Sequence, residues 1–252
     1  RTDPSKSEAE QIRRLNEKLA VKQQTELAAA HEPAVTTDDH RVEVVANIGN
    51  LKDAGRSVEL GGEGVGLLRS EFLYLDRATA PSEDEQTAMY TSLSKALENR
   101  PMIIRTLDVG GDKPLPYLPM PREENPFLGV RGIRVSLEKP ELLRTQLRAI
   151  LRAAETCKLR LMFPMVATMN ELRAAKSILS EEQSRLGVEV DLEVGIMVEV
   201  PSVAMMAAQF AREVDFFSVG SNDLTQYTLA MDRDHPRLAS SADALNPAVL
   251  RL

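Results

Sequence analysis

The sequence predicts an α/β fold, a TIM-like (β/α)8 barrel preceded by an N-terminal helical arm. Short apolar runs alternate with helical segments after Arg41, and polar or charged residues follow most of these runs. Alternating strands and helices favour a parallel sheet, and polar residues where strands end are typical of a barrel with its site at the C-terminal mouth. A doubly wound open sheet is the alternative that the same alternation allows.

Seven apolar runs of strand length follow one another, one fewer than a closed barrel needs. We expect strands at residues 42–48, 64–69, 102–109, 130–135, 159–166, 192–198 and 215–219. The missing eighth run has two explanations. Either one strand has no recognisable apolar run, or the barrel lacks its last strand and helix in this chain. We expect the second.

The segments between these runs carry helical periodicity. We expect helices at residues 51–60, 82–97, 144–156, 170–186, 202–212 and 224–230. The clearest amphipathic face belongs to the third of these together with the residue before it, with Leu143, Leu147, Ile150 and Leu151 on one side. Residues 246–252 look like the start of a further helix, because Pro247 suits a first turn.

The N-terminal segment has a different character from the rest of the chain. Residues 7–30 are polar and contain neither Gly nor Pro, and Ile12, Leu15, Leu19 and Leu27 form only a thin apolar stripe. This pattern predicts a helical arm that ends before Pro33, and not a core helix. We therefore divide the chain into a helical linker arm, residues 1–35, and a barrel, residues 36–252.

Composition excludes several classes of protein. The chain has 252 residues, 43% of them hydrophobic, and a net charge of −7 with a pI near 5.2. An acidic chain lacks the basic surface of a nucleic-acid binder, and no apolar run is long enough to predict membrane insertion. A single cysteine, Cys157, excludes a disulfide framework and fits a reducing compartment, so we expect a cytoplasmic protein.

Arginines follow the early strands of the predicted barrel. Arg69 and Arg105 each come at the end of an apolar run, and Glu71 and Asp108 lie close behind them. Arginine keeps its charge and offers a planar fork of donors suited to carboxylate or phosphate oxygens. A surface ion pair is the simpler reading of Arg69 alone. Two arginines that follow neighbouring strands favour an anion site at the barrel mouth.

Carboxylates follow the late strands. Glu199 comes after the apolar run 195–198, and Asp223 follows the run 216–220. A carboxylate at the end of a buried strand must be paired or metal-bound, and two of them make an oxygen site suited to Mg²⁺. The alternative for Asp223 is a cap on the helix that follows it. The spacing alone leaves both possibilities open.

The remaining motifs are less specific. The sequence GGDK at 110–113 is similar to a phosphate-binding turn but lacks P-loop spacing, and GGEGVG at 61–66 precedes a strand and so favours a plain turn. We expect Cys157 to be a buried structural thiol on the face away from the barrel mouth. The three histidines form no triad or metal pattern.

Five longer motifs resemble a known family. They are GVGLLRSEF at 64–72, RTLDVGGDK at 105–113, ENPFLGVRGIR at 124–134, MVEVP at 197–201 and FFSVGSNDLTQY at 216–227. In order and spacing they resemble the C-terminal phosphoenolpyruvate-binding domain of Enzyme I, the phosphoenolpyruvate–protein phosphotransferase of the bacterial sugar phosphotransferase system. The same domain occurs in fused multiphosphoryl transfer proteins, and the resemblance does not separate the two.

The resemblance implies a TIM-like barrel that binds phosphoenolpyruvate and Mg²⁺ at its C-terminal mouth. It implies that Arg69, Arg105 and Arg131 clamp phosphate or carboxylate oxygens, as does Arg233 in AMDRD at 230–234. It further implies that Lys113 and Asn222 contact the substrate, and that Glu199 and Asp223 hold the metal. Arg69, Arg105 and Arg233 would also take part in catalysis.

The resemblance also implies a reaction and partners. The phosphoryl group of phosphoenolpyruvate would pass to a histidine on a separate N-terminal domain and then to the phosphocarrier HPr, leaving pyruvate, and the chain would form a homodimer. The family's general acid is a cysteine in a Gly-x-Cys-Gly-Glu motif, which this sequence lacks. We therefore expect a chain that recognises substrate but does not complete turnover alone.

Two other functions remain open at this point. One is the corresponding domain of pyruvate phosphate dikinase or phosphoenolpyruvate synthase, which resembles this chain in its arginine and Mg²⁺ positions. The other is a non-catalytic dimerisation module, because family members pair through this domain.

Overall fold

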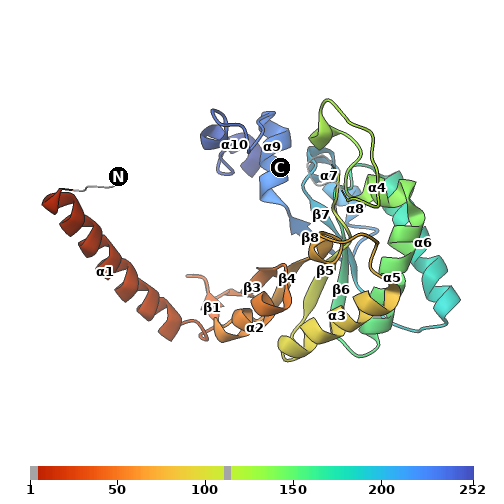
Figure 1. Cartoon of the computed structure of the whole chain (residues 1–252), viewed down its shortest axis with the longest axis horizontal. Helices are drawn as coiled ribbons and strands as arrows, with labels where there is room; N and C mark the ends of the chain where they lie inside the picture. The colour runs from red at the N-terminus through yellow and green to blue at the C-terminus, as the bar shows by residue number, and fades with distance from the viewer. Residues whose placement is uncertain (1–4, 111–114) are drawn as a thin grey trace.

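The computed structural model describes residues 5–110 and 115–252, and within them six parallel strands form the central sheet. Their order is the order of the sequence: β3 (Val45–Ile48), β4 (Gly64–Arg69), β5 (Met102–Arg105), β6 (Leu159–Phe163), β7 (Val194–Val198) and β8 (Phe216–Val219). A doubly wound sheet reverses its strand order at a switch point, which this sheet does not do. The predicted TIM-like partial barrel is confirmed (Figure 1).

Four longer helices cover one face of this sheet. They are α2 (Leu51–Glu59), α3 (Glu83–Ala96), α5 (Pro140–Ala154) and α6 (Met169–Leu186), and each packs against the next (Figure 1). Ser82 and Thr168 begin α3 and α6 with capping boxes, in which the hydroxyl accepts from the third helical N–H and a glutamate returns the bond. The sequence therefore fixes the start of these helices locally.

The two faces of the sheet bury different side chains. Leu68 and Ile104 belong to the large core between sheet and helices, whereas Leu67 packs with Met162 and Met197 in a smaller cluster. Successive side chains in a strand point to opposite faces, so Leu67 and its partners lie on the concave face, inside the partial barrel. Ile103 and Phe216 pack against the same inner cluster.

The predicted strand at 130–135 is wrong. These residues form a turn at Gly132 and then the short helix α4 (Ile133–Glu138). Gly132 has φ 58°, a conformation that interrupts an extended strand. Ile133 and Val135 are buried as residues of helix α4. The alternation of apolar and polar residues in this segment therefore indicated the wrong element.

Smaller departures occur elsewhere. The predicted helix 202–212 is interrupted at Met206 into α7 (Pro201–Met205) and α8 (Ala207–Phe210). The start of the first predicted strand belongs to a short antiparallel hairpin, β1 (Ala34–Val35) with β2 (Arg41–Val42). Cys157 follows α5 as expected but is half-buried, not buried.

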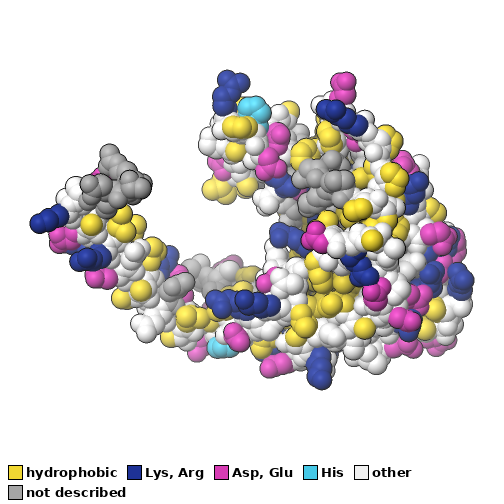
Figure 2. All heavy atoms as spheres, viewed as in Figure 1, with side chains coloured by type: hydrophobic (Ala, Val, Ile, Leu, Met, Phe, Trp, Pro, Cys, Tyr) yellow, Lys and Arg dark blue, Asp and Glu magenta, His cyan; other side chains and the backbone are white. Residues whose placement is uncertain are grey.

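Helix α1 (Lys6–Ala28) extends away from the barrel (Figure 1). Its apolar residues Ile12, Leu15, Leu19 and Leu27 are exposed, and Figure 2 shows apolar side chains along it. The predicted helical arm is thus present. The division at residue 35 stays a prediction.

The other end of the described chain lies beside the barrel mouth. After β8 come α9 (Ser221–Leu229), the turn η3 (Ala239–Ser241) and α10 (Pro247–Leu250), while η1 (Ser70–Leu73) and η2 (Pro126–Leu128) follow β4 and β5. Figure 2 shows open space between this C-terminal segment and α1. None of the helices within residues 5–110 and 115–252 has the length and apolar character to cross a membrane.

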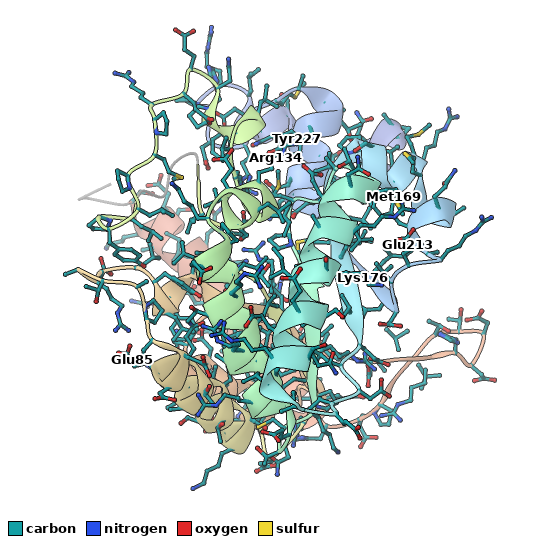
Figure 3. All side chains as sticks on the ribbon, turned by 90° about the vertical axis from the view of Figure 1, so that its right-hand side faces the viewer. Glu85, Arg134, Met169, Lys176, Glu213 and Tyr227 are labelled. Carbon is teal, nitrogen blue, oxygen red and sulfur yellow. The ribbon has the colours of Figure 1, made fainter. Side chains whose placement is uncertain are left out.

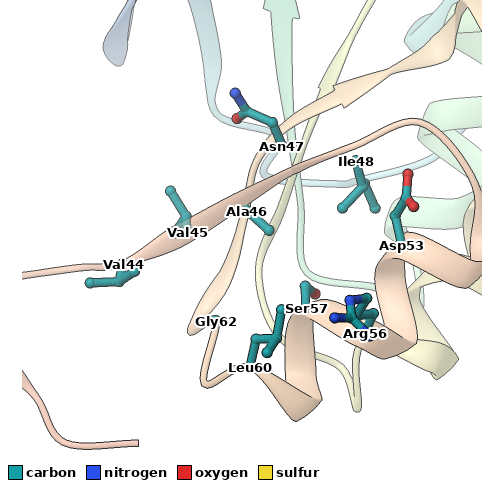
Figure 4. A pocket seen from close by; sticks show the side chains of 10 residues that line it. All are labelled: Val44, Val45, Ala46, Asn47, Ile48, Asp53, Arg56, Ser57, Leu60 and Gly62. Carbon is teal, nitrogen blue, oxygen red and sulfur yellow. The ribbon is translucent and has the colours of Figure 1, made fainter. Parts of the chain in front are cut away.

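A cavity of about 300 Å³ opens between β3 and α2, at one edge of the sheet (Figure 4). Val45, Ile48 and Leu60 line it, and Asn47 points away from the side chains of Asp53 and Arg56. The charged side chains that the strand ends bring together lie elsewhere, at the mouth of the partial barrel.

Candidate active site at the carboxyl ends of the strands

Strand alternation directs three charged side chains to the concave face. Arg69, Arg105 and Glu199 each come two residues after an interior residue of the inner cluster, namely Leu67, Ile103 and Met197. Residues two apart in a strand share a face, so the three charged side chains are directed to the mouth of the barrel. Arg69 and Arg105 are register partners on β4 and β5.

Arg105 is buried between two carboxylates. Its Nη2 lies 2.7 Å from Glu71 Oε1, and its Nη1 lies 3.1 Å from Asp108 Oδ2. Glu71 Oε1 also accepts from the Asp108 backbone N–H at 3.2 Å. Burial acts to lower the pKa of Arg105, but Asp108 and Glu71 outweigh it and raise that pKa. Arg105 therefore stays charged in a nearly dry site.

Arg131 links this site to α9, the helix that follows the last strand of the sheet. Its Nε and Nη2 each lie 3.1 Å from an Asp108 oxygen, and its Nη1 lies 2.8 Å from Asp223 Oδ1. The guanidinium carbon lies 5.8 Å from the centre of the Phe127 ring. Burial acts to lower the pKa of Arg131, and the two carboxylates reverse this effect and raise it.

Gly132 permits this position of Arg131. The turn brings Arg131 alongside Gly110, where the two residues form an isolated antiparallel bridge. A Cβ added to Gly132 would lie 2.8 Å from Met165 Cβ and 3.1 Å from Asp108 Oδ1. Only glycine combines the positive φ with this close approach.

Asp223 lies in the first turn of α9 and bonds two arginines. Oδ1 accepts from Arg131, and Oδ2 accepts from Arg233 Nη1 at 3.2 Å. The residue before the helix is Gly220, and α9 has no side-chain cap. The alternative that Asp223 caps this helix is therefore wrong, because its carboxylate faces the arginines instead. We call Glu71, Arg105, Asp108, Arg131, Asp223 and Arg233 the mouth cluster.

Glu199 lies fully buried beside this cluster with one oxygen unused. Oε1 accepts from the Met165 N–H at 2.6 Å, whereas Oε2 has no hydrogen-bond partner among the described residues. Burial, together with the charges of Asp108 and Asp223, raises the pKa of Glu199 to about 7, although Arg105 and the bond from the Met165 N–H oppose the rise. A buried carboxylate oxygen without a donor is costly unless a cation completes the site.

The oxygen ligands here fit a hard divalent cation. Glu199 Oε2 is free, whereas the two oxygens of Asp223 accept from Arg131 and Arg233. Mg²⁺ prefers carboxylate oxygens and often takes only one or two from the protein, leaving other positions to water and substrate. Within residues 5–110 and 115–252 no group of three or more His, Cys, Asp or Glu side chains is arranged as a metal site.

Two predicted substrate residues that the structure describes, Arg69 and Asn222, are not bonded to the mouth cluster. Arg69 is exposed and makes no ion pair or hydrogen bond with the described residues, which leaves its guanidinium available. Asn222 is also exposed, at the start of α9. Lys113 lies outside the described residues.

Sequence reasoning gave no role to several residues of the site. Glu71 and Asp108 were recognised at strand ends, but nothing in the pattern showed that they bind the arginines directly. Gln226 and Tyr227 on α9 contact the segments that carry Arg233 and Arg131. Their spacing of three and four residues from Asp223 was the available signal, since such residues share a helix face. Tyr227 lies at the same end of the molecule as Arg134 (Figure 3).

Comparison with known proteins identifies the family. A model described as PEP-utilising enzyme, PEP-binding domain, matches residues 23–252. The chain is 55% identical over 248 residues to a multiphosphoryl transfer protein of Rhodobacter capsulatus, covering 98% of this chain and 30% of that protein. It is 50% identical over 258 residues to a phosphoenolpyruvate-protein phosphotransferase of Bacillus subtilis (strain 168), covering 99% and 45% respectively.

A solved citrate lyase from Burkholderia xenovorans LB400 is 15% identical, with a TM-score of 0.47 over 86% of this chain and 62% of that one. A score this low leaves the fold assignment to the strand order described above. The chain spans 30% to 45% of the length of the curated relatives named here. The chain belongs to the PEP-utilising enzymes and corresponds to their PEP-binding domain.

Proposed function

We propose that this chain is the substrate-binding part of a phosphoenolpyruvate–protein phosphotransferase, and that phosphoenolpyruvate and Mg²⁺ bind together at the mouth cluster. The observation that carries the proposal is a set of three buried or half-buried arginines that converge on carboxylates beside an unpartnered Glu199 oxygen. The similar phosphotransferase of Bacillus subtilis supports the reaction class.

Charge balance explains why substrate and cation bind together. The mouth cluster contains three guanidiniums and three carboxylates, so it is already close to neutral without a ligand. A triply negative substrate therefore needs further positive charge. Arg69 and Lys113 supply one unit each and Mg²⁺ supplies two, which together balance the three negative charges of the substrate and that of ionised Glu199. Buried charges that are matched in this way avoid most of the desolvation penalty.

The arginines would exchange carboxylate partners for substrate oxygens. Arg105, Arg131 and Arg233 bind the phosphate or carboxylate of phosphoenolpyruvate, with Asn222 and Lys113 adding contacts to the phosphoryl group. Glu199 and Asp223 hold the metal. A bound Mg²⁺ supplies charge stabilisation for the phosphoryl oxygens and for the enolate left when the phosphorus–oxygen bond breaks. The guanidiniums orient the phosphoryl group and spread its charge.

The phosphoryl acceptor would be a histidine on a separate N-terminal domain, whose ring nitrogen forms the new bond to phosphorus. The phosphoryl group would pass from there to HPr, and the enolate would take a proton to give pyruvate. We place this reaction in the cytoplasm and expect the chain to act as a homodimer.

Isothermal titration of the chain with phosphoenolpyruvate, with and without Mg²⁺, tests the binding site. We expect heat that depends on Mg²⁺ and that Arg105→Ala abolishes, because this substitution removes the central guanidinium. Arg173→Ala is the matched control: Arg173 also pairs with a glutamate, Glu213, but on the outside of the barrel. Undiminished heat for Arg105→Ala would contradict the proposed clamp, and no heat from the unaltered chain would contradict the function.

Transfer needs a second experiment. The chain is mixed with a separately produced N-terminal phosphohistidine domain of a relative and with labelled phosphoenolpyruvate, and labelled phosphohistidine is followed over time. We expect at most a single slow turnover, because the sequence lacks the general-acid motif of the family. Efficient multiple turnover would contradict that expectation.

A further inference from the structure

Helix α9 presents three polar side chains on one face. Asp223, Gln226 and Tyr227 are spaced at i, i+3 and i+4, so they lie together on the helix surface. Asp223 binds Arg131 and Arg233 directly. Gln226 Oε1 accepts from the Arg233 backbone N–H at 3.1 Å. The same face of α9 therefore reaches the segments that carry two of the arginines.

Tyr227 connects this helix to the loop that carries Arg131. Its hydroxyl donates to the carbonyl oxygen of Phe127 in η2, 100 residues earlier in the chain. The Phe127 ring in turn lies under the Arg131 guanidinium, 5.8 Å from its central carbon. Burial raises the pKa of Tyr227, and the charge of Arg131 opposes this rise.

We propose that Tyr227 is a positioning residue that fixes Arg131 for substrate through its hydroxyl and the stacked Phe127 ring. The inference rests on the proposed function, since it concerns how one arginine of that site is held. It adds a residue that makes none of the substrate or metal contacts proposed above.

The need for such a support follows from the partners of Arg131. Its donors bind Asp108 and Asp223, and both sets of bonds must loosen when substrate oxygens take these donors. The contacts of the Arg131 guanidinium with the Phe127 ring use none of the N–H groups that bind Asp108 and Asp223, so they persist during the exchange. An arginine that keeps these contacts loses less side-chain freedom on binding substrate, which favours affinity.

The test compares Tyr227→Phe with Tyr117→Phe. Tyr117 is the matched control, because its hydroxyl also donates to a backbone carbonyl, that of Tyr74, at 2.8 Å from a half-buried position. We expect Tyr227→Phe to weaken phosphoenolpyruvate binding in the presence of Mg²⁺ about fivefold, the typical effect of losing one hydrogen bond between neutral groups. Tyr117→Phe should leave this affinity unchanged, although both variants lose similar thermal stability.

A double-mutant cycle separates positioning from general damage. In an Arg131→Lys background, Tyr227→Phe should cause no further loss of affinity, because the group it positions is gone. The Nε–H resonance of Arg131, assigned by its disappearance in Arg131→Lys, should shift and broaden in Tyr227→Phe. Phe127→Leu, which removes the stacked ring, should produce the same pattern if the tyrosine variant fails to fold.

The outcomes distinguish the inference from the proposed function. If the unaltered chain binds no phosphoenolpyruvate, the proposed function fails. If the unaltered chain binds and Tyr227→Phe binds equally well with an unchanged Arg131 resonance, the function stands and the inference is overturned. Additive losses in the double-mutant cycle would also overturn it, because they would show that Tyr227 acts independently of Arg131.

Discussion

Two regions of this molecule are both built from arginine–carboxylate ion pairs. They differ in how many of their buried polar atoms lack a hydrogen-bond partner. The mouth cluster pairs arginines with carboxylates at the carboxyl ends of the strands. On the outside, α3, α5 and α6 carry a second set that we call the outer network. Its members are Glu83, Arg144, Arg148, Arg152 and Glu182.

The outer network is saturated and its arginines are partly hydrated. Glu182 is buried, and each of its oxygens accepts from a different arginine, at 2.6 Å from Arg144 and 2.9 Å from Arg148. In the mouth region, by contrast, Glu71 Oε2, Arg105 Nε and Glu199 Oε2 are buried without a hydrogen-bond partner. The difference indicates that the outer set stabilises the fold, whereas the inner set keeps capacity for a ligand.

Replacing a glutamate by glutamine should reduce metal affinity in the mouth region and reduce stability in the outer network. We expect the larger effect in the mouth region. Glu199→Gln keeps the oxygen that accepts from Met165 but removes the charge that faces the metal. We expect metal affinity to fall about a hundredfold or more, beyond the 10- to 100-fold typical of losing an outer-shell partner. Titration with Mn²⁺ followed by electron paramagnetic resonance measures this loss.

Thermal stability is the control for this variant. Because a buried charge without a partner is costly, the amide should melt at the same temperature or higher. A strongly destabilised Glu199→Gln protein with intact metal affinity would show that Glu199 serves the fold, and the comparison would then fail.

Glu182→Gln makes the same chemical change in the outer network. The amide can accept only one of the two guanidinium bonds, so we expect a loss of about 2 kcal/mol in the free energy of unfolding. Urea unfolding measures it. Phosphoenolpyruvate and metal affinity should stay unchanged, and a parallel loss of affinity would show that the two regions are coupled.

The smallest expected effect is a change in pH dependence. Burial acts to raise the pKa values of Glu83 and Glu182, but Arg148, helped by Arg152 or Arg144, outweighs it and lowers both. A carboxyl with a lowered pKa in the folded state stabilises the protein above its unfolded pKa, and this stability is lost as the pH falls through the folded pKa.

Melting curves between about pH 6 and pH 3 should therefore show falling stability below about pH 4.5, with a shallower slope for Glu182→Gln. The slope is shallower because the variant keeps only one of the two carboxyl groups with a lowered pKa, that of Glu83. An equal slope for both proteins would assign the acid sensitivity to other groups.

The sequence predicted the parallel sheet and most elements because local signals were consistent with one another. Capping residues Ser82 and Thr168 began helices where expected, and buried runs such as residues 159–163 became strands. The prediction failed at 130–135, where apolar alternation over a few residues is compatible with either a strand or a single helical turn. Gly132 decided between them, and its φ value is not readable from the pattern.

The candidate site was predictable in its residue types and not in its pairing. Arg105, Glu199 and Asp223 were recognisable from their places after apolar runs. That Asp108 is shared by Arg105 and Arg131, or that Asp223 binds two arginines and does not cap α9, depends on where distant segments meet. Local sequence patterns do not indicate which distant segments come into contact. The roles of Glu71, Asp108 and Tyr227 could therefore be identified only from the structure.

Gly132 brings no functional group to the reaction, yet it borders the arginine–aspartate contact on which the site depends. A methyl group there would press on both Met165 and Asp108. A deep mutational scan should therefore find alanine at this position about as harmful as loss of a charged partner. A redesign of the pocket for another anion can change residues at its rim, but it has to keep glycine at position 132.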